Sequence, residues 1–303
     1  MPPQQGFAAF AAPTGGRIRR MKIALVTAIA AFALDDDLAP LAEAIARAGA
    51  RPAVVAWDDP TVSWGRFDAV VLRSPWDYTQ RPAEFLAWCE RIGTQTRLLN
   101  PLPVVKWNTD KHYLAELAAA GVPVIDSVFL EPGGDSRAFP DYDEFVVKPA
   151  IGAGARDTQR YTRAERAQAE AHAQRLLAAR RSVLVQPYLG DVDANGETAL
   201  IFFDGVFSHA IRKGPLLARG EGPTQALFAS EDIRAREPAT DEFDVAHKAL
   251  EAIPFGKLAY ARVDLLPSPA GPRLLELELT EPSLFFAHAA GSADRFAATL
   301  LAK

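Results

Sequence analysis

Short runs of β-branched and aliphatic residues alternate with longer amphipathic segments along the first hundred residues. Such runs predict strands when they are bounded by turn residues. Between the first two runs, residues 35–49 carry apolar residues at helical spacing and end in glycine, which predicts a helix. Strand–helix–strand order is typical of a parallel sheet, so we expect an N-terminal α/β domain over residues 21–107. The predicted strands of this domain are KIALVTA (22–28), RPAVVAW (51–57), RFDAVVLR (66–73) and TRLLN (96–100).

The second part of the chain has a different pattern, with strands that pair as hairpins. GETALIFFDGVFSHAIRK (196–213) predicts a hairpin that turns at Asp204–Gly205, a strong turn dipeptide. Residues 214–224 are glycine-rich and lack a period, so we expect a loop that serves as a lid. Further predicted elements are a strand at 121–130, strands DEFVVKP (143–149) and SVLVQPYLG (182–190), and helices at 162–180 and 242–253.

A second hairpin near the C-terminus carries an acidic face. Its strands are Ala261–Leu266 and Arg273–Leu279. Side chains two apart share a strand face, so Glu276 and Glu278 point the same way, and Asp264 can join them from the partner strand. Three converging carboxylates repel unless a cation lies between them, and Mg²⁺ prefers oxygen ligands. The alternative is a solvated acidic face without a ligand, which acidic alternation alone would favour.

Lysines and glycines earlier in the chain favour a ligand site over a solvated acidic face. Lys148 ends a predicted strand, and Gly152 and Gly154 follow it in a loop where backbone N–H groups can approach a phosphate. The loop lacks the ending of a Walker A motif. We expect Lys111 in the first turn of a helix capped by Thr109, where a cation opposes the helix dipole and an anion would explain it.

The segment RSPWDY (73–78) follows the third predicted strand. Ligands of parallel sheets bind beyond the carboxyl ends of the strands, which is where Arg73 falls. A cation with neighbouring indole and phenol rings suits a small carboxylate or zwitterion. The equally weighted alternative is a loop anchored by Trp76 with a local Arg73–Asp77 ion pair.

Composition excludes several classes of function. The chain has 303 residues, of which 49% are hydrophobic, and a net charge of −5, so it has no basic footprint for nucleic acid or an anionic membrane surface. A single cysteine, Cys89, excludes an internal disulfide and suits a cytoplasmic protein. Residues 1–20 are rich in Pro, Gly and Gln, and we expect a disordered tail there rather than a secretory signal running into KIALVTA.

Five stretches in order resemble the ATP-grasp superfamily, in its glutathione-synthetase and ribosomal-protein-glutamate-ligase branch. The resemblance covers residues 100–288. It implies an ATP-grasp domain over residues 108–303, with a central lid subdomain at about 125–187 and two grasping subdomains built on antiparallel sheets. The five stretches are WNTDK, VVKP with its glycine loop, VQPYL, GETALIFFDGVFSHAIRK and RVDLL with LLELELTEPS.

The resemblance also implies roles for individual residues. Lys111 and Lys148 match the lysines that hold ATP phosphates, and Asp264, Glu276 and Glu278 match the ligands of Mg²⁺ or Mn²⁺. The position of Glu278 is commonly Asn in the family, which puts the number of metal ions in doubt. The adenine hinge and the ribose acid of the family match Gln186, Tyr188, Leu189 and Glu197.

One departure from the family argues against glutathione synthetase itself. The arginine that glutathione synthetases carry two residues after the ribose acid is Ala199 here, and Lys213 can supply the cation instead. RSPWDY, IRKGP and ELTEPSLFF resemble a smaller ATP-grasp group that includes the ligase closing the ring of cycloserine.

These features predict a ligase that joins a carboxylate to an amine through an acylphosphate, with ATP and Mg²⁺. Bidentate guanidinium groups suit carboxylates, so Arg73, Arg262 and Lys213 are the candidates for holding a small amino-acid-like substrate. We expect no nucleic acid or membrane partner, and a homodimer is left open. The alternatives are a non-catalytic nucleotide-binding protein and a small-molecule kinase on the same fold.

Overall fold

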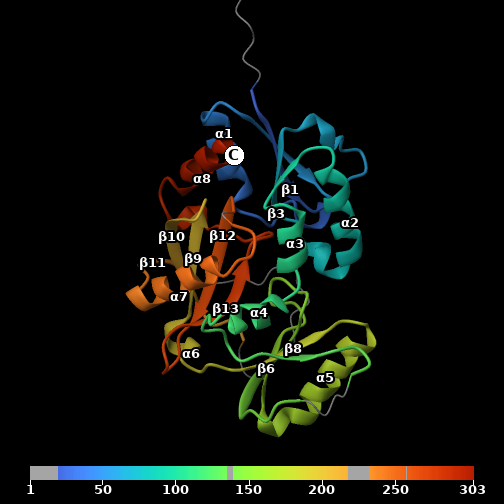
Figure 1. The fold of residues 1–303 in the computed structure, drawn as a ribbon, viewed down its shortest axis with the longest axis vertical. Helices are drawn as coiled ribbons and strands as arrows, with labels where there is room; N and C mark the ends of the chain where they lie inside the picture. The colour runs from blue at the N-terminus through green and yellow to red at the C-terminus, as the bar shows by residue number, and fades with distance from the viewer. Residues whose placement is uncertain (1–19, 135–138, 218–231, 257) are drawn as a thin grey trace, which may run out of the picture.

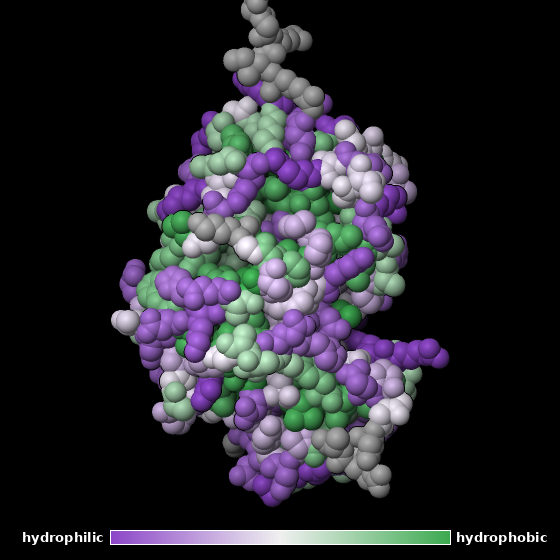
Figure 2. Space-filling view, viewed as in Figure 1, coloured by the Kyte–Doolittle hydropathy of each residue, from purple (hydrophilic) through white to green (hydrophobic). Residues whose placement is uncertain are grey.

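The computed structural model describes residues 20–134, 139–217, 232–256 and 258–303. The predicted N-terminal tail, except residue 20, lies outside the described residues, and so does the predicted lid loop beyond residue 217. Figure 1 shows three sheets, one in the upper N-terminal part, one in the centre and one in the lower lobe. In Figure 2 the outline narrows where the lower lobe joins the body, and hydrophilic and hydrophobic residues are interspersed over this face.

The N-terminal sheet is parallel, as predicted, with strand order β2-β1-β3-β4. Every residue of β3 is buried, as expected for an inner strand of a sheet that is covered on both faces. The indoles of Trp57, Trp64 and Trp88 pack with Phe85 on one face of this sheet. Its elements are β1 (Lys22–Thr27), α1 (Leu38–Arg47), β2 (Arg51–Ala56), β3 (Ala69–Ser74), α2 (Pro82–Gly93) and β4 (Arg97–Leu99).

The lower lobe is an antiparallel sheet of order β5-β8-β6-β7. One side of helix α5 (Arg166–Ala178) packs against this sheet through Ala169, Ala173 and Leu176, although its polar composition predicted a surface element. The strands of this lobe are β5 (Val128–Leu130), β6 (Glu144–Pro149), β7 (Gln159–Thr162) and β8 (Val183–Pro187). The predicted strand over 121–130 is therefore confined to its last residues, with one further bridge from Val124 to Leu274.

The central sheet is antiparallel and has the order β11-β10-β9-β12-β13. Both predicted hairpins are confirmed, and the first turns at Asp204 and Gly205, whose φ angles of 50° and 75° suit this dipeptide. Its elements are β9 (Glu197–Phe203), β10 (Val206–Lys213), β11 (Ile233–Arg236), α7 (Thr240–Glu251), β12 (Tyr260–Leu266) and β13 (Arg273–Glu278). The short helix α6 (Val192–Asn195) leads into β9.

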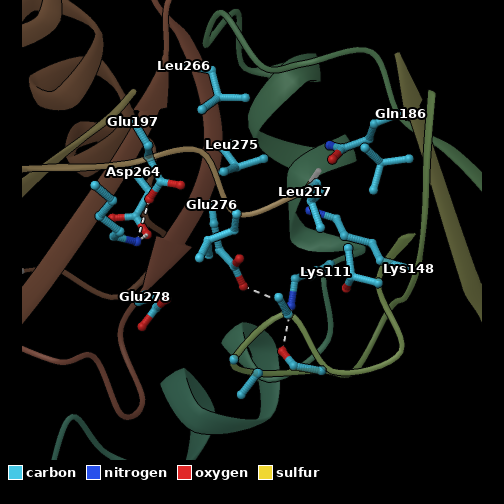
Figure 3. Close-up of a pocket in the computed structure, with 18 of the residues that line it drawn as sticks. Lys111, Lys148, Gln186, Glu197, Leu217, Asp264, Leu266, Leu275, Glu276 and Glu278 are labelled. Atoms are coloured by element: carbon cyan, nitrogen blue, oxygen red, sulfur yellow. Dashed lines mark hydrogen bonds and ion pairs between the residues drawn. The ribbon is translucent and has the colours of Figure 1, made fainter. Parts of the chain in front are cut away.

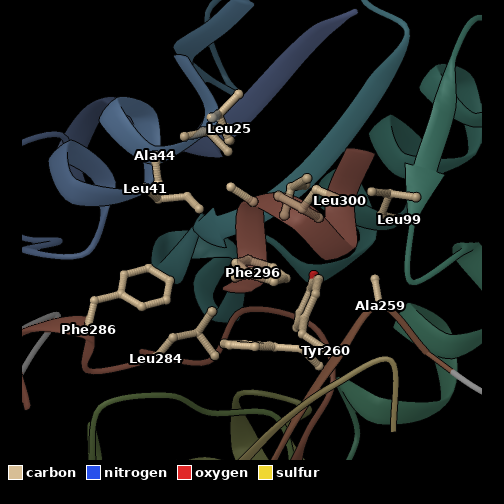
Figure 4. Close-up of a cluster of buried hydrophobic side chains, with 14 of the residues drawn as sticks. Leu25, Leu41, Ala44, Leu99, Ala259, Tyr260, Leu284, Phe286, Phe296 and Leu300 are labelled. Carbon is tan, nitrogen blue, oxygen red and sulfur yellow. The ribbon is translucent and has the colours of Figure 1, made fainter. Parts of the chain in front are cut away.

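The C-terminal helix α8 (Ser292–Ala302) returns to the N-terminal sheet and packs beside α1 (Figure 1). Phe296 and Leu300 of α8 are buried in one hydrophobic cluster with Leu25 of β1 and Leu41 of α1 (Figure 4). Tyr260 of β12 belongs to the same cluster. The N-terminal sheet and the central sheet therefore share a core.

The connection between the N-terminal sheet and the lower lobe differs from the sequence prediction. Residues 102–108 form helix α3 (Leu102–Asn108), and α4 (Tyr113–Ala119) begins only after Lys111. Prolines obscured α3 in the sequence, although a proline is tolerated in the first turn of a helix. The expectation that Thr109 caps a helix with Lys111 in its first turn is wrong, since Thr109 ends α3 and Lys111 lies in the turn between the two helices. No described helix is long and apolar enough to cross a membrane.

Candidate active site

A cavity lies where the three sheets meet. It collects residues from β6 and the loop after it, from the end of β8, from β10, β12 and β13, and from the turn before α4. Every residue singled out in the sequence as a site candidate lines this cavity, except Arg73. Figure 3 shows the acidic side chains facing the two lysines across the cavity.

The glycine loop and the two lysines form one wall of the cavity, here called the lysine wall (Lys111, Lys148 and residues 149–155). The Lys111 ammonium donates to the carbonyl oxygen of Gly152 at 2.8 Å and pairs with Glu276 at 2.8 Å. A Cβ on Gly152 would come within 3.0 Å of the Pro149 ring, and Gly154 has a φ of 60°. Glycine is therefore favoured by close approach at Gly152 and by backbone conformation at Gly154.

Lys148 is 8% exposed, and no ion pair is formed by it among the described residues. Burial lowers the pKa of Lys148 to about 8, although the charge of Glu276 acts in the opposite direction. Burial also opposes the charge on Lys111, but Glu276 outweighs it and raises the pKa of that lysine. The lysine wall thus carries a buried ammonium group, that of Lys148, which forms no ion pair with any of the residues that the structure describes.

The opposite wall, here called the acidic wall, is the face of β12 and β13 that carries Arg262, Asp264, Glu276 and Glu278. The register pairs Asp264 with Glu276 and Arg262 with Glu278, so all four side chains share one face, as the alternation predicted. The Arg262 guanidinium donates to both oxygens of Asp264, at 2.8 and 2.7 Å, and it also pairs with Glu278. Lys213 from β10 lies 3.1 Å from Asp264 and pairs with Glu197.

Burial and the ion pairs together set the pKa values of the carboxyl groups on this wall. Burial opposes ionisation of Asp264, but Arg262 and Lys213 outweigh it and lower the pKa of that carboxyl well below its usual range. Burial raises the pKa of Glu278 to about 8 in spite of Arg262, and it raises the pKa of Glu197 to about 7 in spite of Lys213. Glu276 keeps a lowered pKa because Lys111 and Lys148 outweigh its burial.

The acidic wall has the oxygen ligands that Mg²⁺ prefers. Among the described residues no cluster of three or more Asp, Glu, His or Cys side chains has a metal-binding arrangement, because the carboxylates are spread over separate ion pairs. Glu276 and Glu278 each use one oxygen in these pairs, with Lys111 and Arg262. The donor set fits a hard cation at Glu276 and Glu278, whereas Asp264 would have to exchange Arg262 for the metal.

An apolar slot opens beside the end of β8. Gln186 lies in the ladder opposite Val146, and its side chain donates to Ser127 at 2.9 Å, which leaves its backbone at the cavity edge. Tyr188 lies under the guanidinium of Arg160, 3.4 Å from the ring centre, and Leu189 follows it. The apolar residues of this slot are Ile125, Val146, Leu189, Leu217, Leu266 and Leu275.

Arg73 lies outside the cavity. Its side chain is 0% exposed, and its guanidinium donates to the carbonyl oxygen of Pro282 at 2.8 Å and lies 3.7 Å from Asp37. The expected local pair with Asp77 is also absent from the described contacts, since Asp77 pairs with Arg81 and accepts from Trp57. Trp76 and Tyr78 of the same segment do line the cavity.

Sequence reasoning missed Asn108 and Glu281. Asn108 donates to the Leu277 carbonyl at 2.6 Å and accepts from the Leu279 N–H at 2.7 Å, so it fixes the end of β13. Glu281 is buried in the cavity wall, and its carboxyl interacts with the Tyr78 hydroxyl. Both residues lie inside the motifs WNTDK and ELTEPS, but strand alternation gives no information beyond the end of the strand.

Known proteins match the chain along most of its length. A family model described as the N-terminal domain of D-cycloserine synthetase DcsG matches residues 23–100. The cycloserine biosynthesis protein DcsG of Streptomyces lavendulae is 46% identical over 294 residues, which cover 92% of this chain and 97% of that protein. The crystal structure of D-cycloserine synthetase DcsG has a TM-score of 0.85 at 44% identity, with 92% of this chain and 98% of that one covered.

More distant structures share the fold. The ATP-grasp ligase PsnB, complexed with a variant of its minimal precursor, Mg and ADP, has a TM-score of 0.60 at 21% identity over 93% of this chain and 98% of that one. D-alanine–D-alanine ligase from Bacillus anthracis, complexed with ATP, has a TM-score of 0.62 at 14% identity over 93% and 96% of the two chains. The parallel sheet followed by two antiparallel sheets is therefore the ATP-grasp fold, as the motifs implied. The chain belongs to the ATP-grasp carboxylate–amine ligases, in the family of DcsG.

Proposed function

We propose that this protein is an ATP- and Mg²⁺-dependent ligase that converts a carboxylate of a small amino-acid-like substrate into an acylphosphate and closes an amide bond within the same molecule. The observation that carries the proposal is the pairing of the two walls. Lys111, Lys148 and the glycine loop face Glu276 and Glu278 across one cavity. Surplus positive charge on one side suits a triphosphate, and carboxylates on the other suit its metal.

The chemistry needs activation because a carboxylate is a poor electrophile. A substrate carboxylate oxygen attacks the γ-phosphorus, the bond to the bridging oxygen of ADP breaks, and an acylphosphate forms. An amine nitrogen then attacks the acyl carbon, inorganic phosphate leaves, and the amine gives up a proton. Lys111 and Lys148 would neutralise the phosphates during both steps. Electrostatic stabilisation of this kind is the main contribution of the protein to phosphoryl transfer.

Other residues have proposed tasks in the same scheme. Mg²⁺ held by Glu276 and Glu278 would offset charge on the outer phosphates. The backbone at Gln186 and Leu189 would meet the adenine edge beside the apolar slot, and Glu197 would lie near the ribose. Arg262 and Lys213 are the cations placed to hold the reacting carboxylate, since both lie in the cavity wall next to Asp264.

The size of the substrate follows from the N-terminal side of the cavity. Trp76 and Tyr78 close that side, and both are buried. DcsG is a cycloserine biosynthesis protein. Cycloserine is a serine-like molecule in which the carboxyl carbon is joined to an aminooxy nitrogen while the α-amino group stays free. We therefore propose ring closure on an aminooxy amino acid of this kind.

The test is ADP release by the purified protein with ATP, Mg²⁺ and 2-amino-3-(aminooxy)propanoate. The expected result is ADP formed in equal amounts with a cyclic product, and none without Mg²⁺. ADP formed with a phosphorylated but open product would indicate a small-molecule kinase. Nucleotide binding without ADP from a panel of aminooxy and dipeptide-like acids would indicate a non-catalytic nucleotide-binding protein and overturn the proposal.

A further inference from the structure

The carboxylates that line the cavity differ in whether they pair with a cationic side chain. Glu197 and Asp264 pair with Lys213, Glu276 pairs with Lys111, and Glu278 pairs with Arg262. Glu281 is the remaining carboxylate of the cavity wall, and within the described part of the chain no Lys, Arg or His nitrogen lies within 4.0 Å of it. A buried carboxylate without a cation is costly unless a ligand supplies one.

Glu281 is also held rigidly. It belongs to the segment 279–286, here called the tethered segment, which leaves the end of β13. Side chains of the N-terminal domain bind its carbonyl oxygens: Trp76 donates to Glu281 at 3.3 Å, and Arg73 donates to Pro282. Asp37 accepts the backbone N–H groups of residues 284, 285 and 286 at 2.6 to 2.9 Å.

The surroundings of the Glu281 carboxyl place it at the reacting end of the cavity. Glu281 is 9% exposed, and its carboxyl interacts with the Tyr78 hydroxyl. Burial raises the pKa of Glu281 to about 7, Tyr78 and the charges of Lys111 and Arg262 act to lower it, and Glu276 acts to raise it. Those charges belong to the lysine wall and the acidic wall, so Glu281 lies within electrostatic reach of the site for the outer phosphates and their metal.

We propose that Glu281, oriented by Tyr78, binds the α-ammonium group of the substrate and so selects amino acids over simple carboxylic acids. The inference rests on the proposed function, because it assigns the part of the substrate that does not react. An aminooxy amino acid has one reacting carboxylate, one neutral nucleophile and one α-ammonium group that is cationic at neutral pH. The first falls to Arg262 and Lys213, and the third requires an anion that is not already paired.

The other ligands of the cavity fit Glu281 less well. A carboxylate repels phosphate, so Glu281 does not serve the nucleotide directly. A metal role is disfavoured by position, because Glu281 lies beyond the end of β13 while Glu276 and Glu278 share the strand face. Tyr78 comes from the N-terminal domain, so this subsite is built by both parts of the chain.

The experiment measures binding by calorimetry in the presence of Mg²⁺ and ADP, with no turnover required. The probes are cycloserine and its analogue without the amino group, each titrated into the wild-type protein and into Glu281→Gln. We expect the wild type to bind cycloserine at least about tenfold more tightly than the analogue, and Glu281→Gln to lose that preference, because removing one partner of a buried charge pair weakens it strongly. Glu251→Gln, a change of an exposed carboxylate on α7, is the matched control.

Two further measurements make the result decisive. Affinity for Mg²⁺ and ADP should be unchanged in Glu281→Gln, and a fall in that affinity would make Glu281 a metal ligand instead and overturn the inference. If Glu281→Gln does not fold, Glu281→Asp replaces it, and its preference should be intermediate. A wild type that binds both probes equally, or neither, would overturn the inference even if the ADP assay succeeds, and a failed ADP assay with intact probe selectivity would overturn only the proposed ligation.

Discussion

The two walls of the cavity handle charge in opposite ways. On the acidic wall, each carboxylate already has a cationic partner before any ligand arrives, since Asp264 and Glu278 share the guanidinium of Arg262 and Glu276 pairs with Lys111. On the lysine wall, Lys148 is buried without an ion pair among the described residues. The difference indicates that an anion gains most from the lysine wall, whereas on the acidic wall Asp264 would have to exchange its partner to bind a metal.

The largest effect should come from Glu276, which joins the two walls through Lys111. Glu276→Gln removes a proposed metal ligand and should lower turnover at least about a hundredfold, because a bound metal supplies several kcal/mol of transition-state stabilisation. ADP release measures turnover, and an unchanged far-UV circular dichroism spectrum shows that the fold is intact. Activity within a few-fold of the wild type would indicate that the acidic face of the hairpin is solvated and binds no metal.

Replacing Lys148 should affect nucleotide binding more than the chemical steps of the reaction. Lys148→Ala should weaken nucleotide binding by roughly thirtyfold or more, since the loss of one partner of a buried charge pair costs about 2–5 kcal/mol. The nucleotide-induced rise in melting temperature should then disappear. Lys106→Ala, on an exposed position of α3, should keep the full rise. An unchanged shift for Lys148→Ala would contradict the assignment of the lysine wall to phosphate.

The same lysine predicts a pH dependence. Because burial lowers the pKa of Lys148 to about 8, the side chain loses its charge as the pH rises through that value, and nucleotide affinity should fall. One linked proton limits the fall to about tenfold per pH unit. Lys148→Arg keeps its charge and should flatten the profile. A wild-type affinity that stays constant between pH 7 and pH 10 would show that Lys148 does not bind the phosphates.

Arg73 belongs to neither wall and should have the smallest effect on the nucleotide. Arg73→Lys loses a buried hydrogen bond to Pro282, which costs about 1–3 kcal/mol and lowers the melting temperature by a few degrees. The substrate KM should rise severalfold, because the tethered segment loosens, while ATP affinity stays nearly the same. Equal losses of ATP and substrate affinity would show that Arg73 supports the whole site.

The sequence predicted what depends on local periodicity. Alternation placed Glu276 and Glu278 on one face, and the strand ending at Lys148 with glycines after it placed the loop. The sequence could not predict the ion pair between Arg262 and Asp264. Alternation shows which side chains share a strand face, but it does not show which of them pair with one another.

Contacts between distant segments account for the remaining differences. The position of Arg73 at a strand end was predicted, but its direction depends on Pro282, which lies 209 residues further along the chain. Glu281 was missed for the same reason, since Tyr78, with which it interacts, comes from a distant segment of the chain. The prediction placed Lys111 in the first turn of a helix. That prediction failed because the prolines in α3 made this preceding helix unrecognisable in the sequence.

The three hydrogen bonds that the Asp37 carboxylate accepts have a consequence for folding during synthesis. Asp37 and the backbone groups it binds are separated by 247 residues or more, and α8, which completes the N-terminal core, comes later still. On the ribosome, the N-terminal sheet emerges first, and one of its apolar faces stays uncovered until the residues of α8 have been synthesised. The segment that carries Glu281 can be fixed only once residues 284–286 have been synthesised, so a chain that stops before them would hold neither a finished core nor a finished active site.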